Sequence, residues 1–217
     1  MNDLESFCYN TKGKIIHKYT HYLKIYEKHF SKFRNKSPVI VEVGIGHGGS
    51  LQMWKNYFGE GAQIHGIDIV ERRFLEEDQI TIWLGNQSDK DFWKIFFQRI
   101  PEVDIFIDDG SHESKDQIIT LEEVFSRISK EGVYLCEDLH TAYSPHFNGG
   151  YKHPESFIEY SKEIADTINS SVIPEIIPLV KKFDDVRSMT FYSGVVVIEK
   201  GDISSTGECL HFGEERA

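Results

Sequence analysis

The chain has few cysteines and no excess of positive charge, and each shortage excludes a class of protein. Its 217 residues include three cysteines, Cys8, Cys136 and Cys209, with no CxxC pair. This number and spacing exclude a disulfide framework and a cysteine zinc knuckle, and they favour a reducing cytoplasm. The 24 Lys and Arg residues against 35 Asp and Glu residues give a formal net charge of −11. That balance argues against a nucleic-acid partner and against attachment to an anionic membrane.

Long hydrophobic runs and targeting segments are also missing from the sequence. The apolar runs are too short to span a bilayer, and the opening MNDLESFCYN lacks the basic and apolar regions of a signal peptide. A hydrophobic content of 40% over this length is enough for one folded core. We therefore expect a single cytoplasmic domain over 1–217, with an N-terminal helical cap (1–37), an α/β core (38–201) and a polar tail (202–217).

Short apolar strands alternate with amphipathic helices through the middle of the chain. The patterns predict strands at 39–43, 64–68, 80–84, 103–108 and 133–136. They predict helices at 14–33, 51–58, 91–100, 117–128 and 154–170. Such alternation indicates parallel βαβ units, and therefore an α/β, Rossmann-like, doubly wound sheet. Strand-like runs on both sides of Ser193-Gly194 predict an antiparallel hairpin that closes the sheet at its C-terminal end.

A glycine-rich turn follows the first predicted strand. Gly44, Gly46 and Gly49 fit the pattern G-x-G-x-x-G, and Asp68 ends the second predicted strand. Glycines let the backbone approach a ligand closely, and an acid at that strand end can accept ribose hydroxyls. The pattern predicts a cofactor with a nucleoside part, and leaves a dinucleotide and S-adenosylmethionine open. Glu42 favours S-adenosylmethionine, because a carboxylate attracts its ammonium and sulfonium but repels a pyrophosphate.

Two later strands each end on a pair of acids that is followed by a histidine. Asp108-Asp109 precedes His112, and Glu137-Asp138 precedes His140. Neighbouring parallel strands bring these ends together, and converging carboxylates repel one another unless a cation lies between them. Oxygen ligands without cysteine suit Mg²⁺, Mn²⁺ or Fe²⁺. A single Asp-Gly is usually an ordinary turn, but two acid pairs with trailing histidines favour a divalent-metal site.

The loop over residues 140–153 is rich in histidine, tyrosine and glycine. Aromatic faces suit the apolar side of a sugar ring, and they suit a protein core equally well. We expect His140, Tyr143 and Tyr151 to contact the acceptor substrate from this loop.

The glycine turn and the acid blocks together resemble a known family. The run Val41 to Gly46, continued by Ser50-Leu51-Gln52-Met53-Trp54, resembles class I S-adenosylmethionine-dependent methyltransferases. The blocks Ile107-Asp108-Asp109-Gly110-Ser111-His112 and Glu137-Asp138-Leu139-His140 are more specific. With the closing Thr190-Phe191-Tyr192 to Gly201, they resemble the metal-dependent sugar O-methyltransferases of macrolide biosynthesis, acting on mycinamicin and tylosin sugars. The resemblance spans about residues 10–201.

The resemblance implies a role for each matching residue. It implies a metal held by Asp109, Glu137 and Asp138, with His112 as the general base and Asp109 also catalytic. It implies a cofactor site with S-adenosylmethionine lined by Glu42, Gly44, Gly46, Ser50, Asp68, Asn86, Gln87, Asp108 and Tyr19. One departure concerns the acceptor: a mycinamicin enzyme carries a large extra N-terminal domain, whereas 38 residues precede Val39 here. The acceptor surface is therefore expected to differ.

The acceptor is the least determined part of this interpretation. We expect a sugar or nucleotide-sugar substrate and a homo-oligomer. The Lys, Ile, Asn and Phe usage indicates an AT-rich bacterial genome, which favours a capsule or lipopolysaccharide sugar. Three alternatives stay open: an NAD-dependent oxidoreductase, a methyltransferase with a non-sugar acceptor, and a non-catalytic nucleotide-binding subunit. The oxidoreductase leaves the acid cluster without a role.

Overall fold

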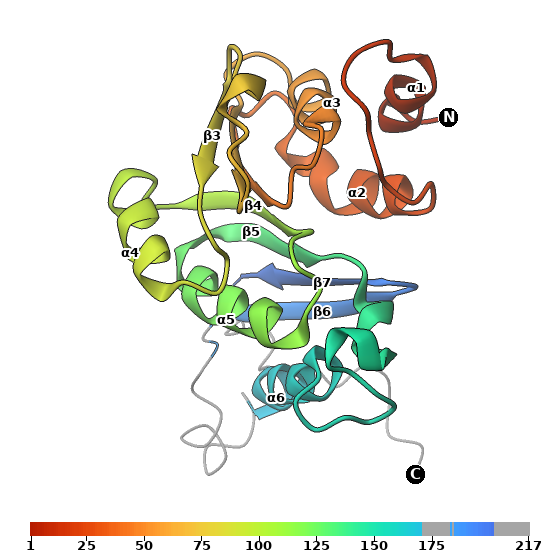
Figure 1. Ribbon diagram of the computed structural model, residues 1–217, viewed down its shortest axis with the longest axis vertical. Coiled ribbons are helices and arrows are strands. Elements are labelled where there is room, and N and C mark those ends of the chain that lie inside the picture. The colour runs from red at the N-terminus through yellow and green to blue at the C-terminus, as the bar shows by residue number, and fades with distance from the viewer. Residues whose placement is uncertain (171–182, 184, 202–217) are drawn as a thin grey trace, which may run out of the picture.

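The centre of the computed structural model is a mixed sheet in the order β3-β2-β1-β4-β5-β7-β6 (Figure 1). The structure describes residues 1–170, 183 and 185–201. The first five strands pair in parallel, and β7 runs antiparallel to both β5 and β6. The strands are β1 Val39–Val43, β2 Gln63–Asp68, β3 Ile80–Leu84, β4 Val103–Asp108, β5 Ile128–Cys136, β6 Val186–Tyr192 and β7 Val195–Lys200.

Helices cover both faces of the sheet (Figure 1). The helices are α1 Asp3–Asn10, α2 Tyr22–Phe30, α3 Gly49–Phe58, α4 Lys90–Arg99, α5 Ser114–Val124 and α6 Phe157–Ser170. Short 3-10 turns are η1 Ser31–Phe33, η2 Arg73–Leu75, η3 Phe125–Arg127, η4 Leu139–Tyr143 and η5 Pro145–Phe147. Alternate strand residues enter the two cores: Ile40 packs with α1, α2 and α3, whereas Val41 packs with α4, α5 and α6. This alternation follows from the period of two along a strand.

The predicted fold class is confirmed. The parallel strands and their crossover helices lie where the hydrophobic pattern places them, and the antiparallel hairpin turns at Ser193-Gly194. Gly194 adopts a φ of 76° in this turn, which a residue with a side chain rarely adopts. Parallel connections through helices leave the carboxyl ends of β1, β4 and β5 along one edge, where the predicted site lies.

The predicted helix over residues 14–33 is wrong in its first half. The helix α2 starts at Tyr22, and residues 11–21 form no helix. This segment passes over the glycine turn: a Cβ on Gly49 would lie 2.3 Å from the Ile15 carbonyl oxygen. Its Lys18 side chain enters the sheet edge and binds carboxylates there. Tertiary ion pairs therefore override the helical spacing of the apolar residues.

Other boundaries differ from the predictions by smaller amounts. Strand β5 begins at Ile128 instead of residue 133, and helix α5 begins at Ser114 instead of residue 117. The proposed tail over 202–217 lies outside the described residues, and the division into cap, core and tail stays a prediction. None of the helices in the described part of the chain has the length and apolar character to cross a bilayer.

Candidate active site

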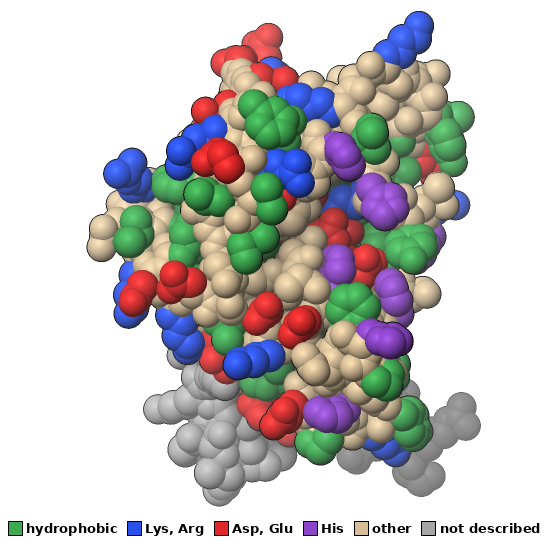
Figure 2. Space-filling model, viewed as in Figure 1, with side chains coloured by type: hydrophobic (Ala, Val, Ile, Leu, Met, Phe, Trp, Pro, Cys, Tyr) green, Lys and Arg blue, Asp and Glu red, His purple; other side chains and the backbone are tan. Residues whose placement is uncertain are grey.

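A cavity of about 450 Å³ opens at the carboxyl ends of β1, β4 and β5. Its lining gathers most of the predicted site residues from distant parts of the sequence. They are Tyr19, Glu42, Gly44, Gly46, Ser50, Asp109, His112, Glu137 and Asp138. The N-terminal segment adds Ile15, His17, Lys18 and Tyr22. On the face drawn in Figure 2, histidine and acidic side chains gather around this hollow.

The glycine turn forms one wall of the cavity. Gly44 has a φ of +82°, and a Cβ there would lie 1.9 Å from the Asp109 backbone oxygen. Gly46 also has a positive φ, but a Cβ there would meet nothing within 4 Å. Gly48 caps the N-terminus of α3, which begins at Gly49 and points free N–H groups toward the turn. The turn therefore leaves open space beside a helix N-terminus.

Gly44→Ala is expected to destabilise the protein by at least about 2 kcal/mol, because the added Cβ meets backbone that cannot move freely. Gly46→Ala is the matched control, with a left-handed backbone but no clash, and should cost less, about 1 kcal/mol. Urea unfolding of both variants measures the difference. Equal losses would show that the approach of Asp109 does not restrict position 44.

Glu42 is fully buried at the end of β1 and makes two polar contacts. Its Oε2 accepts a 2.7 Å hydrogen bond from Trp54 Nε1, and its Oε1 lies 3.0 Å from Lys18 Nζ. Trp54 is on α3, directly after the glycine turn. The carboxylate is therefore held in a fixed orientation at the cavity wall.

Lys18 is the cation at the centre of the acid cluster. Its Nζ lies 2.6 Å from Asp109 Oδ2 and 2.9 Å from Glu137 Oε1, with only 4% of the side chain exposed. Burial alone would lower the Lys18 pKa, but Asp109, Glu137 and Glu42 raise it well above its usual value. Burial raises the pKa of Glu137 to about 8, against the opposing effect of Lys18. The cluster thus contains more carboxyl groups than its single ammonium group can neutralise.

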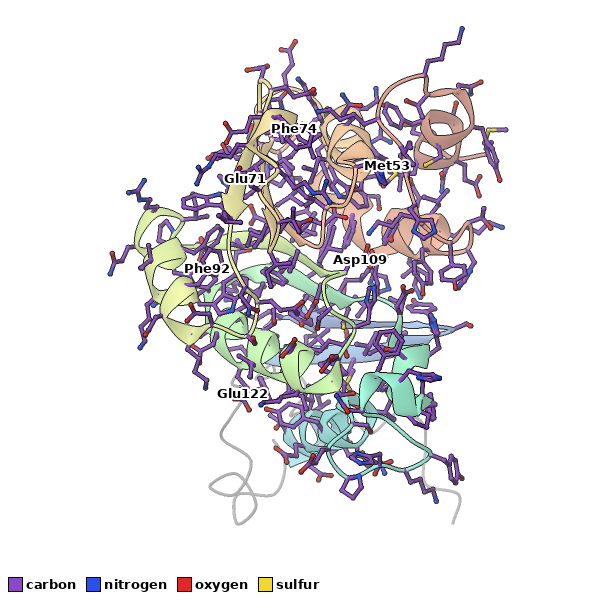
Figure 3. All side chains as sticks on the ribbon, in the orientation of Figure 1. Met53, Glu71, Phe74, Phe92, Asp109 and Glu122 are labelled. Carbon is purple, nitrogen blue, oxygen red and sulfur yellow. The ribbon has the colours of Figure 1, made fainter. Side chains whose placement is uncertain are left out.

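Three of the cavity side chains form a candidate metal cluster. One ligand atom each from Asp109, His112 and Asp138 lies within 4.8 Å of the others. Figure 3 places Asp109 beyond the end of β4, beside the N-terminal helices. The set predicted from the family resemblance has Glu137 in place of His112. Glu137 and Asp109 both contact Lys18, so the predicted set and the cluster that the structure forms lie in one cavity.

His112 has an unusual backbone and lies next to Asp138. Its φ is +61°, in the left-handed region, and its carbonyl oxygen accepts a 2.8 Å hydrogen bond from Thr141 Oγ1. The Nε2 atom lies 3.7 Å from Asp138 Oδ2, and the buried Nδ1 has no hydrogen-bond partner among the described residues. Strain of this kind persists where the surroundings fix the residue. The imidazole is therefore held facing the acid cluster.

Four predicted cofactor residues lie outside the lining of this cavity. Asp68 ends β2 and accepts a hydrogen bond from the Val70 N–H, while the Asn86 side chain is exposed and accepts from Ser88. The buried Gln87 donates to Asp108 Oδ1 and accepts from the Ser111 N–H. Burial raises the pKa of Asp108 to about 6. Gln87 and Asp108 thus fix the turn before His112, and their contact with a cofactor stays a prediction.

The predicted acceptor residues divide between a second cavity and the surface. His140 and Tyr143 line an adjacent cavity of about 600 Å³ between η4, α6 and the β6-β7 hairpin. The ring centroids of Tyr19, which lines the first cavity, and His140, which lines the second, are 6.0 Å apart, so the two cavities are neighbours. Tyr151 is 81% exposed and lines neither cavity.

A layer of side chains above the acid cluster was not predicted from the sequence. Lys18, Tyr22 and Tyr26 follow one another at intervals of four residues, and each contacts a strand-end carboxylate. Tyr22 donates to Asp138 Oδ1 at 2.8 Å, and Tyr26 donates to Glu137 Oε1 at 2.6 Å. Tyr22 and Tyr26 fit the apolar spacing of the predicted helix over 14–33, and no local pattern connects Lys18 with the strand-end acids.

The sheet order, the closing hairpin and the glycine turn define the class I S-adenosylmethionine-dependent methyltransferase fold. The chain matches no protein-family profile. It is related in sequence to sugar O-methyltransferases over nearly its whole length, and it spans about half the length of those relatives.

Two sequence relatives and one solved structure illustrate this similarity. The 8-demethyl-8-alpha-L-rhamnosyl tetracenomycin-C 2'-O-methyltransferase of Streptomyces olivaceus is 32% identical, covering 88% of this chain and 52% of that protein. The demethylmacrocin O-methyltransferase of Streptomyces fradiae is 32% identical, and the match covers 95% of this chain and 54% of that protein. The structure of the mycinamycin-pathway methyltransferase MycE with Mg, SAH and mycinamycin VI matches with a TM-score of 0.80 and 29% identity. The match covers 93% of this chain and 53% of the MycE chain.

Proposed function

We propose that this chain transfers a methyl group from S-adenosylmethionine to a sugar hydroxyl, with the help of a divalent metal ion. The observation that carries the proposal is the meeting of Asp109, His112 and Asp138 in the cavity that the glycine turn also lines. A nucleotide-binding turn and an acid cluster in one cavity are what a metal-assisted transfer needs. Incubation with methyl-labelled S-adenosylmethionine and a panel of glycosides tests it by mass spectrometry.

The residues of the cavity fit both groups. Gly46 leaves the space that a cofactor beside α3 would fill, and the buried Glu42 offers negative charge to a sulfonium and an ammonium. Asp109, Glu137 and Asp138 supply the oxygen donors that Mg²⁺, Mn²⁺ or Fe²⁺ accepts, with His112 as a nitrogen donor in reach. The solved MycE complex contains Mg and SAH, the product that S-adenosylmethionine leaves after methyl transfer.

The chemical difficulty is that a sugar hydroxyl is almost fully protonated at neutral pH. A divalent ion, when bound, lowers the pKa of a hydroxyl that it contacts. His112 accepts the hydroxyl proton as the oxygen attacks the methyl carbon, and the Asp138 Oδ2 lies 3.7 Å from its Nε2. The glycine turn and Glu42 would hold the methyl donor, and a fixed donor reduces the entropic cost of the transfer.

The second cavity supports an acceptor with an apolar part. Its described lining has no acid, and its one lysine, Lys162, pairs with Glu159. Apolar lining comes from Leu139, Tyr143, Ile158, Ala165, Met189 and Phe191. A nucleotide diphosphate would need several cations there. We therefore propose a glycoside of an apolar small molecule, in agreement with the tetracenomycin and mycinamicin relatives. The predicted capsule or lipopolysaccharide sugar has no support from these relatives.

Removal of divalent metal is expected to abolish methyl transfer. After dialysis against EDTA, the rate should fall to background, because His112 alone cannot ionise a sugar hydroxyl efficiently. Added Mg²⁺ or Mn²⁺ should restore the rate, and thermal melting checks that the chelated protein is still folded. Full activity in excess chelator would remove the metal from the proposal.

Calorimetry separates the proposal from an NAD-dependent oxidoreductase. S-adenosylhomocysteine should bind and NAD should not, because the buried Glu42 would repel a pyrophosphate at the turn. The opposite pattern would favour the oxidoreductase. The expected homo-oligomer stays a prediction, which sedimentation velocity would test.

A further inference from the structure

Lys18 is the only ammonium group that the described residues place inside the acid cluster. It reaches one oxygen each of Glu42, Asp109 and Glu137, from three different strand ends, at 3.0 Å or less. It comes from residues 11–21, the segment that crosses the cavity in place of the expected helix. A lysine with 4% of its side chain exposed is rare unless it is paired.

Lys18, Tyr22 and Tyr26 contact only one oxygen each of Asp109, Glu137 and Asp138. Lys18 uses Asp109 Oδ2, Lys18 and Tyr26 share Glu137 Oε1, and Tyr22 uses Asp138 Oδ1. The second oxygen of each carboxylate accepts no hydrogen bond from the described residues. The N-terminal segment therefore orients each acid by one oxygen and leaves the other available to a ligand.

The charges in the cluster also affect how tightly it binds a metal ion. One ammonium does not match three carboxyl groups in number, so the cluster still attracts a cation. A positive charge a few ångströms from a divalent ion repels it strongly, even when the effective dielectric constant is about 20. Lys18 thus stabilises the empty cluster and opposes tight binding of the metal at the same time.

We propose that Lys18 is a built-in counter-ion of the metal site, which holds the carboxylates in position and keeps the divalent ion weakly bound and exchangeable. This inference rests on the proposed metal-assisted function. Lys18 is a positioning residue here, because it acts through Asp109, Glu137 and Glu42.

The test is Mn²⁺ binding to Lys18→Met and the unmodified protein, followed by electron paramagnetic resonance. We expect Lys18→Met to bind Mn²⁺ at least about tenfold more tightly. The metal-free variant should melt at a lower temperature than the unmodified protein, and Mn²⁺ should raise its Tm by more. Lys14→Met is the matched control, since Lys14 pairs with Glu77 away from the cluster, and its Mn²⁺ affinity should not change. Lys18→Gln replaces Lys18→Met if the latter does not fold.

Two more variants distinguish the effect of the Lys18 charge from the effect of the size of its side chain. Lys18→Arg keeps the cation and should bind Mn²⁺ within a few-fold of the unmodified protein. The double variant Lys18→Met/Glu42→Gln loses one charge of each sign, so its affinity should return toward the original value. Equal or weaker Mn²⁺ binding by Lys18→Met overturns the inference, as does a double variant that binds as tightly as Lys18→Met.

The outcomes also distinguish this inference from the proposed function. If the unmodified protein binds Mn²⁺ and methylates a glycoside while Lys18→Met binds Mn²⁺ equally well, only the counter-ion role fails. If neither protein binds Mn²⁺, the metal-assisted function and the counter-ion role both fail.

Discussion

His112→Ala is expected to lower kcat by about 10²–10⁴-fold, the usual contribution of a general base. The imidazole lies in the cavity with its Nε2 3.7 Å from Asp138 Oδ2, within reach of a substrate hydroxyl bound there. The binding of S-adenosylhomocysteine should not change, because the glycine turn and Glu42 are untouched. Kinetics that follow formation of the methylated glycoside measure the rate, and calorimetry measures the binding of S-adenosylhomocysteine.

The same variant decides between two roles for His112. As a base, its loss leaves Mn²⁺ affinity unchanged; as a metal ligand, its loss weakens Mn²⁺ binding along with kcat. His153→Ala is the control, because His153 lies in the loop before α6, outside the lining of this cavity, and its ring Nδ1 accepts a hydrogen bond from the Glu155 N–H. Turnover at the original rate in His112→Ala would exclude both roles.

Asp109→Asn should lower kcat/KM by at least about 10³-fold, because a bound metal contributes several kcal/mol and each 1.36 kcal/mol is a factor of ten. Asp109 is shared by the metal set predicted from the sequence and by the cluster that the structure forms. The substitution keeps the shape of the side chain and removes its charge. Mn²⁺ titration should show the loss of metal binding directly.

Asp116→Asn provides a matched control for this substitution. Asp116 lies in the first turn of α5, outside the described lining of the cavity. Its variant should keep both turnover and Mn²⁺ affinity. Because Lys18 also loses a partner in Asp109→Asn, the Tm of both variants must be compared. Metal-dependent turnover at the original rate in a folded Asp109→Asn protein would exclude Asp109 as a ligand.

The strand-end acids could be predicted because local patterns position them. Asp109 and Glu137 follow buried apolar strands, and parallel strands end at the same edge of a sheet. The glycine turn could be predicted for the same reason, since a strand, the glycines and a helix follow one another without interruption. Asn86 and Gln87 were weaker predictions, because no periodicity indicates which way a loop side chain faces.

The sequence by itself determined the fold class, the glycine turn and the edge of the sheet where the acids gather, because these depend on patterns within a few residues of one another. Only the tertiary structure decided the role of Lys18 and the path of residues 11–21. The partners of Lys18 lie 91 and 119 residues away along the chain, at Asp109 and Glu137. The attraction of a buried cation to converging carboxylates outweighs the local preference for helix. That attraction exists only after the strands have been brought together.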